Sequence, residues 1–194
     1  MYTSYGFRQR IAMATVLSMF ILSGCGNNTS PAIISFSPSG GTVGTAVTII
    51  GTNFDPITTN NTVAFNGTPT VVTNATNTVI VAAVPFGATT GPISVTVNGQ
   101  SQTATSSTNF SIMPTISSIS PSSGPVDTVV TITGTGFDTT TANNTVLFNG
   151  TTAVVTSSNG TTLVTAVPSG ATSGHITVTV NGQSTISSIT FTVN

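Results

Sequence analysis

The chain contains one sequence unit twice, and this duplication constrains its fold more than any other feature. Residues 31–101 align without gaps with residues 114–184, at an offset of about 83 positions and with roughly 60% identity. The runs Phe65-Asn66-Gly67 and Asn98-Gly99-Gln100 recur as Phe148-Asn149-Gly150 and Asn181-Gly182-Gln183. A unit of about 80 residues that occurs twice predicts two domains of the same fold, one after the other.

Each copy consists of short segments with the period of a β-strand. In the second copy, Val130 and Ile132 alternate with Thr131 and Thr133, which is typical of a strand with one buried face. Gly134 and Gly136 then allow a sharp turn that returns Phe137 to the core. We expect strands near residues 115–119, 128–133, 145–149, 153–156, 161–167, 175–180 and 186–193.

The last two strands of the second copy show the expected packing. Ile176, Val178 and Val180 should face inward, because successive side chains of a strand point to opposite faces. Asn181-Gly182 favours a type I′ hairpin turn between the two strands. No helical periodicity follows residue 25, so the pattern predicts an all-β protein built of sandwiches.

These motifs resemble those of the IPT/TIG domain family. The runs that carry the resemblance are Pro114-Thr115-Ile116, Ser120-Pro121-Ser122-Ser123-Gly124, Thr131-Ile132-Thr133-Gly134-Thr135-Gly136-Phe137, Val146-Leu147-Phe148-Asn149-Gly150, Val167-Pro168 and Gly174-His175-Ile176-Thr177-Val178. The resemblance implies two tandem immunoglobulin-like β-sandwiches, expected at residues 31–112 and 113–194. Such domains occur in bacterial surface proteins, beside carbohydrate-active modules, and in animal receptors and transcription factors. The family therefore implies a fold and no particular function.

The N-terminus has the proportions of a secretory signal. Met1–Arg10 is polar and basic, and Ile11–Ser23 is an apolar run of about 13 residues, shorter than the about 20 that a membrane-spanning helix needs. The run ends in Leu22-Ser23-Gly24-Cys25, which resembles the lipobox of bacterial lipoproteins. The resemblance implies that residues 1–24 are a signal peptide and that Cys25 receives lipid as the first residue of the mature chain.

Cys25 is the one cysteine in the sequence, so no disulfide within the chain competes for it. The alternative is a thiol that carries no lipid and only happens to follow the apolar run. Residues 25–30 would form a short polar tether. Because Gly26 is not the aspartate associated with inner-membrane retention, the resemblance implies an outer-membrane lipoprotein whose domains face the periplasm or the cell surface.

After residue 25 the sequence contains no Lys, Arg, Glu, Trp or Tyr. Nucleic acid is excluded as a partner, because phosphate neutralisation requires Lys or Arg. Regular β-branched residues with little charge favour a packed β protein over a disordered one. A surface rich in Thr and poor in charge also presents little electrostatic repulsion to self-association.

The residue inventory argues against an enzyme. Catalysis of hydrolysis or group transfer needs a nucleophile, a base or a metal, and the chain after Cys25 has one histidine and three aspartates. His175 stands where the first copy has Pro92, and we interpret it as a surface histidine. We expect no catalytic residue and no cofactor.

Asp55 and Asp138 occupy equivalent positions directly after a phenylalanine. We interpret them as turn residues whose carboxylates accept nearby backbone amides. Calcium is the alternative at Asp138, with carbonyls of Gly40-Gly41 as further ligands at the domain junction. Asp127 precedes the strand that Asp138 follows, so the two should lie at opposite ends of their domain.

Phe86 is the one apolar residue that we nominate as a partner contact, because the second copy has Ser169 in its place. Local packing of its ring is the alternative. The other aromatic positions recur and should belong to the cores, Phe36, Phe54, Phe65 and Phe110 corresponding to Ile119, Phe137, Phe148 and Phe191.

Three hypotheses on function follow. The first is a lipoprotein without enzymatic activity, anchored by Cys25, that acts as a spacer, adhesion or protein-interaction module. The second is a carbohydrate-binding accessory lipoprotein of a glycan-processing system, against which the lack of Trp and Tyr weighs. The third is an enzyme, which the residue inventory disfavours. A surface structural protein that associates with itself is a further alternative.

Overall fold

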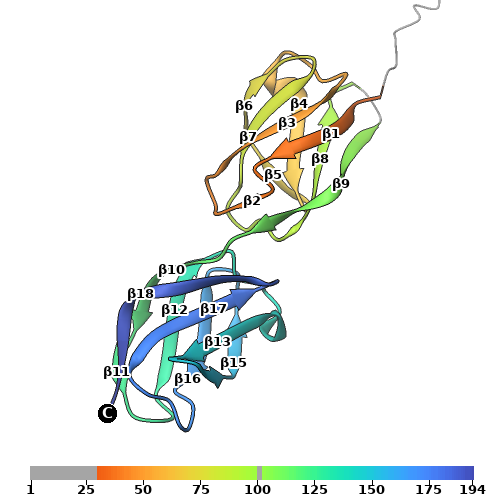
Figure 1. Ribbon diagram of the computed structural model, residues 1–194. Coiled ribbons are helices and arrows are strands. Elements are labelled where there is room, and N and C mark those ends of the chain that lie inside the picture. The colour runs from red at the N-terminus through yellow and green to blue at the C-terminus, as the bar shows by residue number, and fades with distance from the viewer. Residues whose placement is uncertain (1–29, 100–101) are drawn as a thin grey trace, which may run out of the picture.

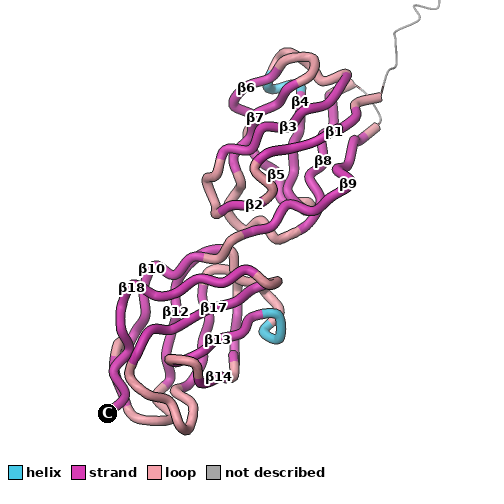
Figure 2. Tube along the Cα trace, in the orientation of Figure 1, coloured by secondary structure: helices cyan, strands magenta, loops and turns pink. Residues whose placement is uncertain are grey.

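The computed structural model describes residues 30–99 and 102–194, which fold into two β-sandwiches in series (Figure 1, Figure 2). The predicted signal peptide of residues 1–24 and the predicted lipidation site Cys25 lie outside the described residues. The prediction of two tandem immunoglobulin-like sandwiches is confirmed. Within the described ranges, no helix is long and apolar enough to cross a membrane.

The first sandwich packs a four-stranded sheet on a five-stranded one, in the orders β1-β3-β7-β6 and β2-β9-β8-β4-β5. All neighbouring strands are antiparallel except β2 and β9, which pair in parallel. Its elements are β1 (Ala32–Ser37), β2 (Gly40–Gly41), β3 (Ala46–Thr52), the 3-10 turn η1 (Thr58–Asn60), β4 (Asn61–Phe65), β5 (Thr68–Thr70), β6 (Val72–Ala75), β7 (Val79–Ala83), β8 (Gly91–Val97) and β9 (Thr103–Ile112).

The second sandwich repeats this topology strand for strand. Its sheets have the orders β10-β12-β16-β15 and β11-β18-β17-β13-β14, again with one parallel pair, β11 with β18. Its elements are β10 (Thr115–Ser120), β11 (Ser123–Gly124), β12 (Val129–Thr135), η2 (Thr141–Asn143), β13 (Asn144–Phe148), β14 (Thr151–Ala153), β15 (Val155–Ser158), β16 (Thr162–Ala166), β17 (Gly174–Val180) and β18 (Gln183–Val193). The two-residue strands β2 and β11 were not expected from the sequence.

Each sandwich has its own core, and the recurring aromatic residues lie in it as predicted. Phe148 and Phe191 meet edge to face at a centroid distance of 5.1 Å, and Phe65 and Phe110 meet at the same distance in the first sandwich. Phe36 is half-buried against the first core. Edge-to-face pairs of this kind stabilise a core beyond the area that they bury.

The predicted facing of the last hairpin is confirmed. Ile176, Val178 and Val180 are buried, whereas the threonines between them are partly exposed. Asn181 and Gly182 have φ angles of 48° and 80°, both positive as a type I′ turn requires.

The strand expected at residues 153–156 is wrong as a single element. Thr151–Ala153 pairs with β13 in one sheet, and Val155–Ser158 pairs with β16 in the other. Val154 lies at this change of sheet and is 78% exposed, as is Val71 at the equivalent point of the first sandwich. Alternation along the sequence cannot reveal such a crossing, because both halves keep the period of a strand.

Gly134 is required by a close approach of neighbouring atoms. A Cβ at this position would lie 1.8 Å from the carbonyl oxygen of Thr115 and 2.7 Å from the ring of Phe137. The phenylalanine after the strand therefore folds back over a glycine, and its ring is 2% exposed. This explains why the strand, the glycine and the phenylalanine recur together in both copies.

Replacement of Phe148 by Ala should lower the free energy of unfolding of the second sandwich by about 3–5 kcal/mol, because it removes a buried ring and its edge-to-face partner contact. Urea unfolding followed by circular dichroism measures this loss. Phe86→Ala is the matched control, and its effect should stay within about 0.5 kcal/mol because the ring is exposed. Similar losses in the two variants would contradict the packing described above.

Candidate functional site

The chain enters the first sandwich at the end that points away from the second (Figure 1). Ser30 is fixed at this end, since its carbonyl oxygen accepts a hydrogen bond from Asn53 Nδ2 at 2.9 Å and its hydroxyl bonds to the side chain of Gln102. Asn53 directly follows β3. Any anchor that precedes residue 30 is therefore attached to this end of the molecule.

Asp55 and Asp138 act as the turn residues that the sequence predicted. Asp138 Oδ1 accepts the amide of Thr140 at 2.8 Å, and Asp55 Oδ1 accepts the amide of Ile57 at the same distance. The buried Asn144 supports the second loop, accepting from the Asp138 amide at 2.9 Å and donating to the carbonyls of Asp138 and Thr140. The carboxylates thus have a structural role in both copies.

The groups considered for calcium at the junction have partners within the protein. Gly41 offers its carbonyl oxygen to the amide of Met113 at 2.9 Å, and the carbonyl of Asp138 also accepts from the hydroxyl of Ser158. Among the described residues, no group of three or more His, Cys, Asp or Glu side chains lies close enough to hold a metal ion. Nothing in this geometry favours calcium over the turn.

His175 lies exposed at the start of β17, where its Nδ1 is 2.8 Å from the carbonyl oxygen of Ser187. The hydroxyl of Ser187 is itself occupied, because it accepts the amide of Ile176 and donates to the carbonyl of Ile189. Ser106 makes the same pair of bonds in the first sandwich, where Pro92 stands in place of the histidine. The serine therefore shapes the strand pair and does not depend on His175.

Phe86 is 65% exposed in the loop between β7 and β8, so its ring projects from the surface. This loop precedes Gly91, which pairs with Phe110 near the end of β9, and so it lies toward the second sandwich. The ring of Phe86 is therefore accessible to a partner, as a contact residue must be.

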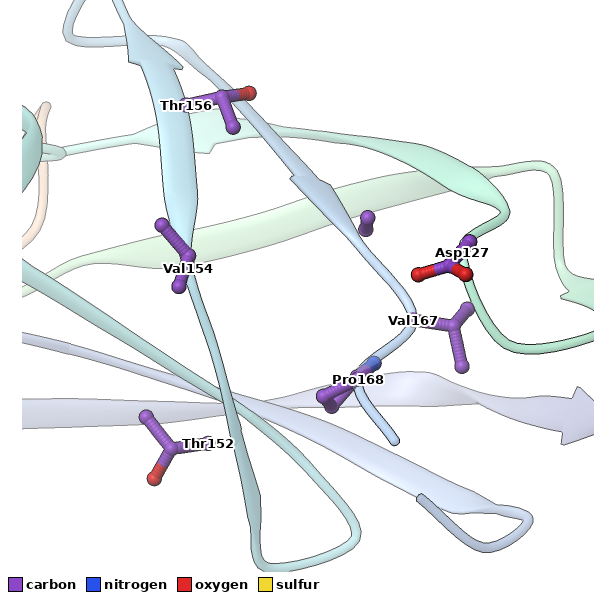
Figure 3. A pocket seen from close by; sticks show the side chains of 7 residues that line it. Asp127, Thr152, Val154, Thr156, Val167 and Pro168 are labelled. Atoms are coloured by element: carbon purple, nitrogen blue, oxygen red, sulfur yellow. The ribbon is translucent and has the colours of Figure 1, made fainter. Parts of the chain in front are cut away.

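A hollow of about 220 Å³ lies in the second sandwich beside the strand that changes sheets. Figure 3 shows the carboxylate of Asp127 pointing across it toward Val154. The lining residues are Asp127, Thr152, Val154, Thr156, Ala166, Val167 and Pro168. The hydroxyl of Thr156 donates to the carbonyl of Val164 at 3.1 Å and so retains only its acceptor capacity. A carboxylate and two threonine oxygens around an apolar floor suit a small polar ligand with one apolar face.

The hollow was not predicted from the sequence, although the sequence does show that Asp127 replaces the Gly44 of the first copy. This residue has a φ angle of 70°, in the left-handed region, and the first copy has Gly44 there with a φ of 88°. Aspartate tolerates this region at a cost that glycine does not have. Among the residues that line the hollow, Asp127 carries the one carboxylate, and the first copy has a glycine in its place. This difference distinguishes the second sandwich from the first.

Exposed aliphatic side chains differ in position between the sandwiches. Ile34, Ile50 and Ile57 are 66%, 45% and 57% exposed in the first, and Ile186 and Ile189 are 65% and 42% exposed on β18 of the second. The exposed isoleucines of the two sandwiches thus lie on different strands, and they offer apolar surface that the protein itself does not cover, as do the exposed Val71, Val126, Val129 and Val154.

The family model described as IPT/TIG domain matches residues 31–112 and 114–193 of this chain. No curated protein matches the sequence. The solved structures that resemble it include the surface glycan-binding protein PbSGBP-B from Prevotella bryantii, at 17% identity and a TM-score of 0.53, over 84% of this chain and 42% of that one.

Two further similar structures are an auxiliary nutrient binding protein from Bacteroides thetaiotaomicron (18% identity, TM-score 0.44, 79% of this chain and 43% of that one) and the extracellular region of plexin A4 (22% identity, TM-score 0.41, 88% and 19%). The chain thus spans less than half the length of each of the three structures. Of the three, the Prevotella protein has the highest TM-score, and at its identity the likeness concerns the fold alone.

Replacement of Asp138 by Ala should lower the free energy of unfolding by about 1 kcal/mol, because the amide of Thr140 loses its acceptor. Asp138→Asn keeps an oxygen at the same place and should be close to the wild type. Thermal unfolding with and without added calcium measures both effects. We expect no calcium dependence, and a wild-type melting temperature raised by calcium but unchanged in Asp138→Asn would restore the calcium hypothesis.

Proposed function

The chain belongs to the IPT/TIG domain family, and we propose that it is a lipid-anchored spacer without enzymatic activity. In this proposal, Cys25 carries the anchor in the outer membrane and the two sandwiches hold binding surfaces away from the bilayer. The observation that carries the proposal is the connection between the sandwiches, which is short, hydrogen-bonded to the first sandwich and packed against the second.

The strands β9 and β10 are separated only by Met113 and Pro114. The Met113 amide donates to the carbonyl of Gly41 at 2.9 Å, and the preceding amide, of Ile112, donates to Thr90 Oγ1 at 2.9 Å. On the other side Gly136 lies so close that a Cβ there would be 3.0 Å from the carbonyl oxygen of Met113. A connection that is hydrogen-bonded to one domain and packed against the next supports a stiff pair, as a spacer requires.

The anchor would lie close to the first sandwich. Residues 25–29 span at most about 17 Å when fully extended, since each residue adds about 3.4 Å. Two or three acyl chains on Cys25 would hold the base of the spacer at the membrane, because one chain alone binds a bilayer only marginally. The remaining length of the spacer would then project from the membrane.

A spacer without enzymatic activity also agrees with the roles of the titratable groups. Asp55 and Asp138 hold their own loops, and His175 lies beside a serine whose hydroxyl is occupied. Interfaces made by this surface would contain few ion pairs. Association with a partner should therefore depend little on salt.

Glycan binding is the second candidate, and the hollow beside Asp127 favours it. Carboxylate and threonine oxygens can bind sugar hydroxyls, while Val154 and Pro168 can contact the apolar face of a sugar ring. One structural neighbour is described as a surface glycan-binding protein. That description applies to the neighbour, and for this chain it only suggests glycans as the class of ligand to test in a binding assay.

Replacement of Cys25 by Ala should abolish incorporation of labelled palmitate and release the protein from the membrane fraction, because the variant has no thiol to accept the lipid. Ser23→Ala, which keeps a small residue in the same tetrapeptide, should be lipidated like the wild type. Membrane association that persists in Cys25→Ala would contradict the anchor.

The orientation of the anchored protein can be read on intact cells with a protease that does not require Lys or Arg. Cleavage of the wild type on unbroken cells would identify a surface spacer, and protection until the outer membrane is opened would identify a periplasmic one. Either outcome agrees with an anchored spacer and tells where its partner is to be sought.

Replacement of Asp127 by Gly should abolish glycan binding, if the second candidate holds, while changing the free energy of unfolding by no more than about 1 kcal/mol, because the first copy has glycine at this left-handed position. Titration calorimetry with soluble plant and bacterial oligosaccharides measures the binding. Asp127→Asn, which keeps a hydrogen-bonding oxygen, should retain part of the affinity. Binding unchanged in Asp127→Gly would exclude the hollow as the site.

A further inference from the structure

Four aliphatic residues of the first copy are replaced by hydroxyl residues in the second. Ile34, Ile50, Ile57 and Val79 correspond to Ser117, Thr133, Thr140 and Thr162. Because the strands of the two sandwiches match one for one, each pair occupies the same place in the fold. The same scaffold thus tolerates hydroxyl side chains at all four places, and packing within the domain does not require the aliphatic ones.

The four residues lie on one end of the first sandwich. Ile50 and Val79 are direct partners across β3 and β7, and Ser35, next to Ile34, is the partner of Ile50 across β1 and β3. Ile57 directly precedes η1, which lies against β6 at the edge of the same sheet. We call these four residues the proximal patch; its three isoleucines are exposed and Val79 is half-buried.

The proximal patch lies where the chain enters the sandwich. Ala32 at the start of β1 pairs with Thr52 at the end of β3, and the following residue, Asn53, holds the carbonyl of Ser30. Ile34 is four residues from Ser30, about 13 Å along an extended strand. In the second sandwich the equivalent end adjoins the connection to the first, and there the four side chains carry hydroxyl groups.

We propose that the proximal patch rests on the lipid bilayer, so that the end of the first sandwich that carries it, with the neighbouring part of β1, β3 and β7, meets the membrane that holds the Cys25 anchor. This inference rests on the proposed function, since the anchor brings the patch to the bilayer. Cys25 and Ser30 are five positions apart along the chain, a span of no more than about 17 Å, so this end of the sandwich stays at the membrane surface. Aliphatic side chains held at the membrane surface in this way would contact the boundary between the lipid headgroups and the acyl chains.

The charges around the patch fit a lipid surface. Among the described residues, the carboxylate at this end of the first sandwich is that of Asp55, and it is bonded to the amide of Ile57 and to Asn60 Nδ2. It therefore faces its own loop. The patch has no Lys or Arg to attract anionic headgroups, so the contact is apolar and should be insensitive to salt and to the content of anionic lipid.

The test places an environment-sensitive fluorophore beside the patch. Lipidation uses the thiol of Cys25, so a cysteine at Ser35 (Ser35→Cys) gives one labelling site, and Ser118→Cys gives the matched site on the second sandwich. Both serines are exposed. The mature protein is purified from membranes, labelled, and reconstituted in vesicles of phosphatidylethanolamine and phosphatidylglycerol with or without nitroxide-labelled lipid.

We expect the label at position 35 to shift its emission to shorter wavelength on vesicles and to be quenched by nitroxide lipid, equally at low and high salt. The label at position 118 should show neither effect. The fourfold variant Ile34→Ser, Ile50→Thr, Ile57→Thr and Val79→Thr, which adopts the residues of the second copy, should lose both effects while remaining on the vesicles. Phe86→Ser, which removes an exposed ring at the other end of the same sandwich, should retain them.

Three results would overturn the inference. In the first, the label at position 35 is as accessible to water as the label at position 118. In the second, the fourfold variant keeps the quenching although circular dichroism shows that it is folded. In the third, the emission shift arises without vesicles and grows with protein concentration. The last result would identify the patch as a contact between two copies.

A separate result would overturn the proposed anchor while leaving the patch to be decided. If mass spectrometry finds no acyl chain on Cys25, the protein is attached instead by a histidine tag in place of residues 1–25 to vesicles that contain a nickel-chelating lipid. Quenching at position 35 under that attachment supports the patch, and its absence there refutes it.

Discussion

Buried amide side chains hold the ends of both sandwiches in place, in a protein that has almost no charge with which to form ion pairs. Asn144 is 6% exposed and bonds to the amide of Asp138 and to the carbonyls of Asp138 and Thr140, and Asn61 does the same in the first sandwich. A buried amide that loses these partners would carry the full cost of desolvation. These hydrogen bonds hold the loop after β3, and the equivalent loop after β12, in a single conformation. Each loop lies at the end of its domain where the chain enters the domain.

The rest of the molecule is built on that end. In the second sandwich it adjoins the connection Met113-Pro114, and Gly136 allows the close approach. In the first sandwich it receives Ser30 through Asn53, which has a φ angle of 59° where the second copy has Gly136 at 73°. The same loop thus serves in one copy as the junction between domains and in the other as the base of the molecule, which is why the two copies could diverge in the side chains around it.

Divergence between two copies of one scaffold separates the needs of the fold from those of the surface. Phe148 and Phe65 recur and lie in the cores, because the packing of each sandwich requires a ring there. Asp127, Phe86 and the proximal patch differ between the copies, and they lie at the surface or line its hollow. Comparison of the two copies therefore indicates which of these side chains the fold requires and which belong to the surface of one copy alone.

The sequence by itself determined the duplication, the class of fold, most of the strands and the residues of the cores, because alternation and turn residues such as Asn181-Gly182 act locally along the chain. It also indicated the turn role of Asp138, whereas it left open whether Phe86 is exposed or packs locally. Only the tertiary structure decided that the strand around Val154 divides between two sheets, that Asp127 overlooks a hollow, and that Ile34, Ile50, Ile57 and Val79 gather at one end. These residues are far apart in sequence, and the pairing of strands that brings them together depends on contacts between segments that no local pattern records.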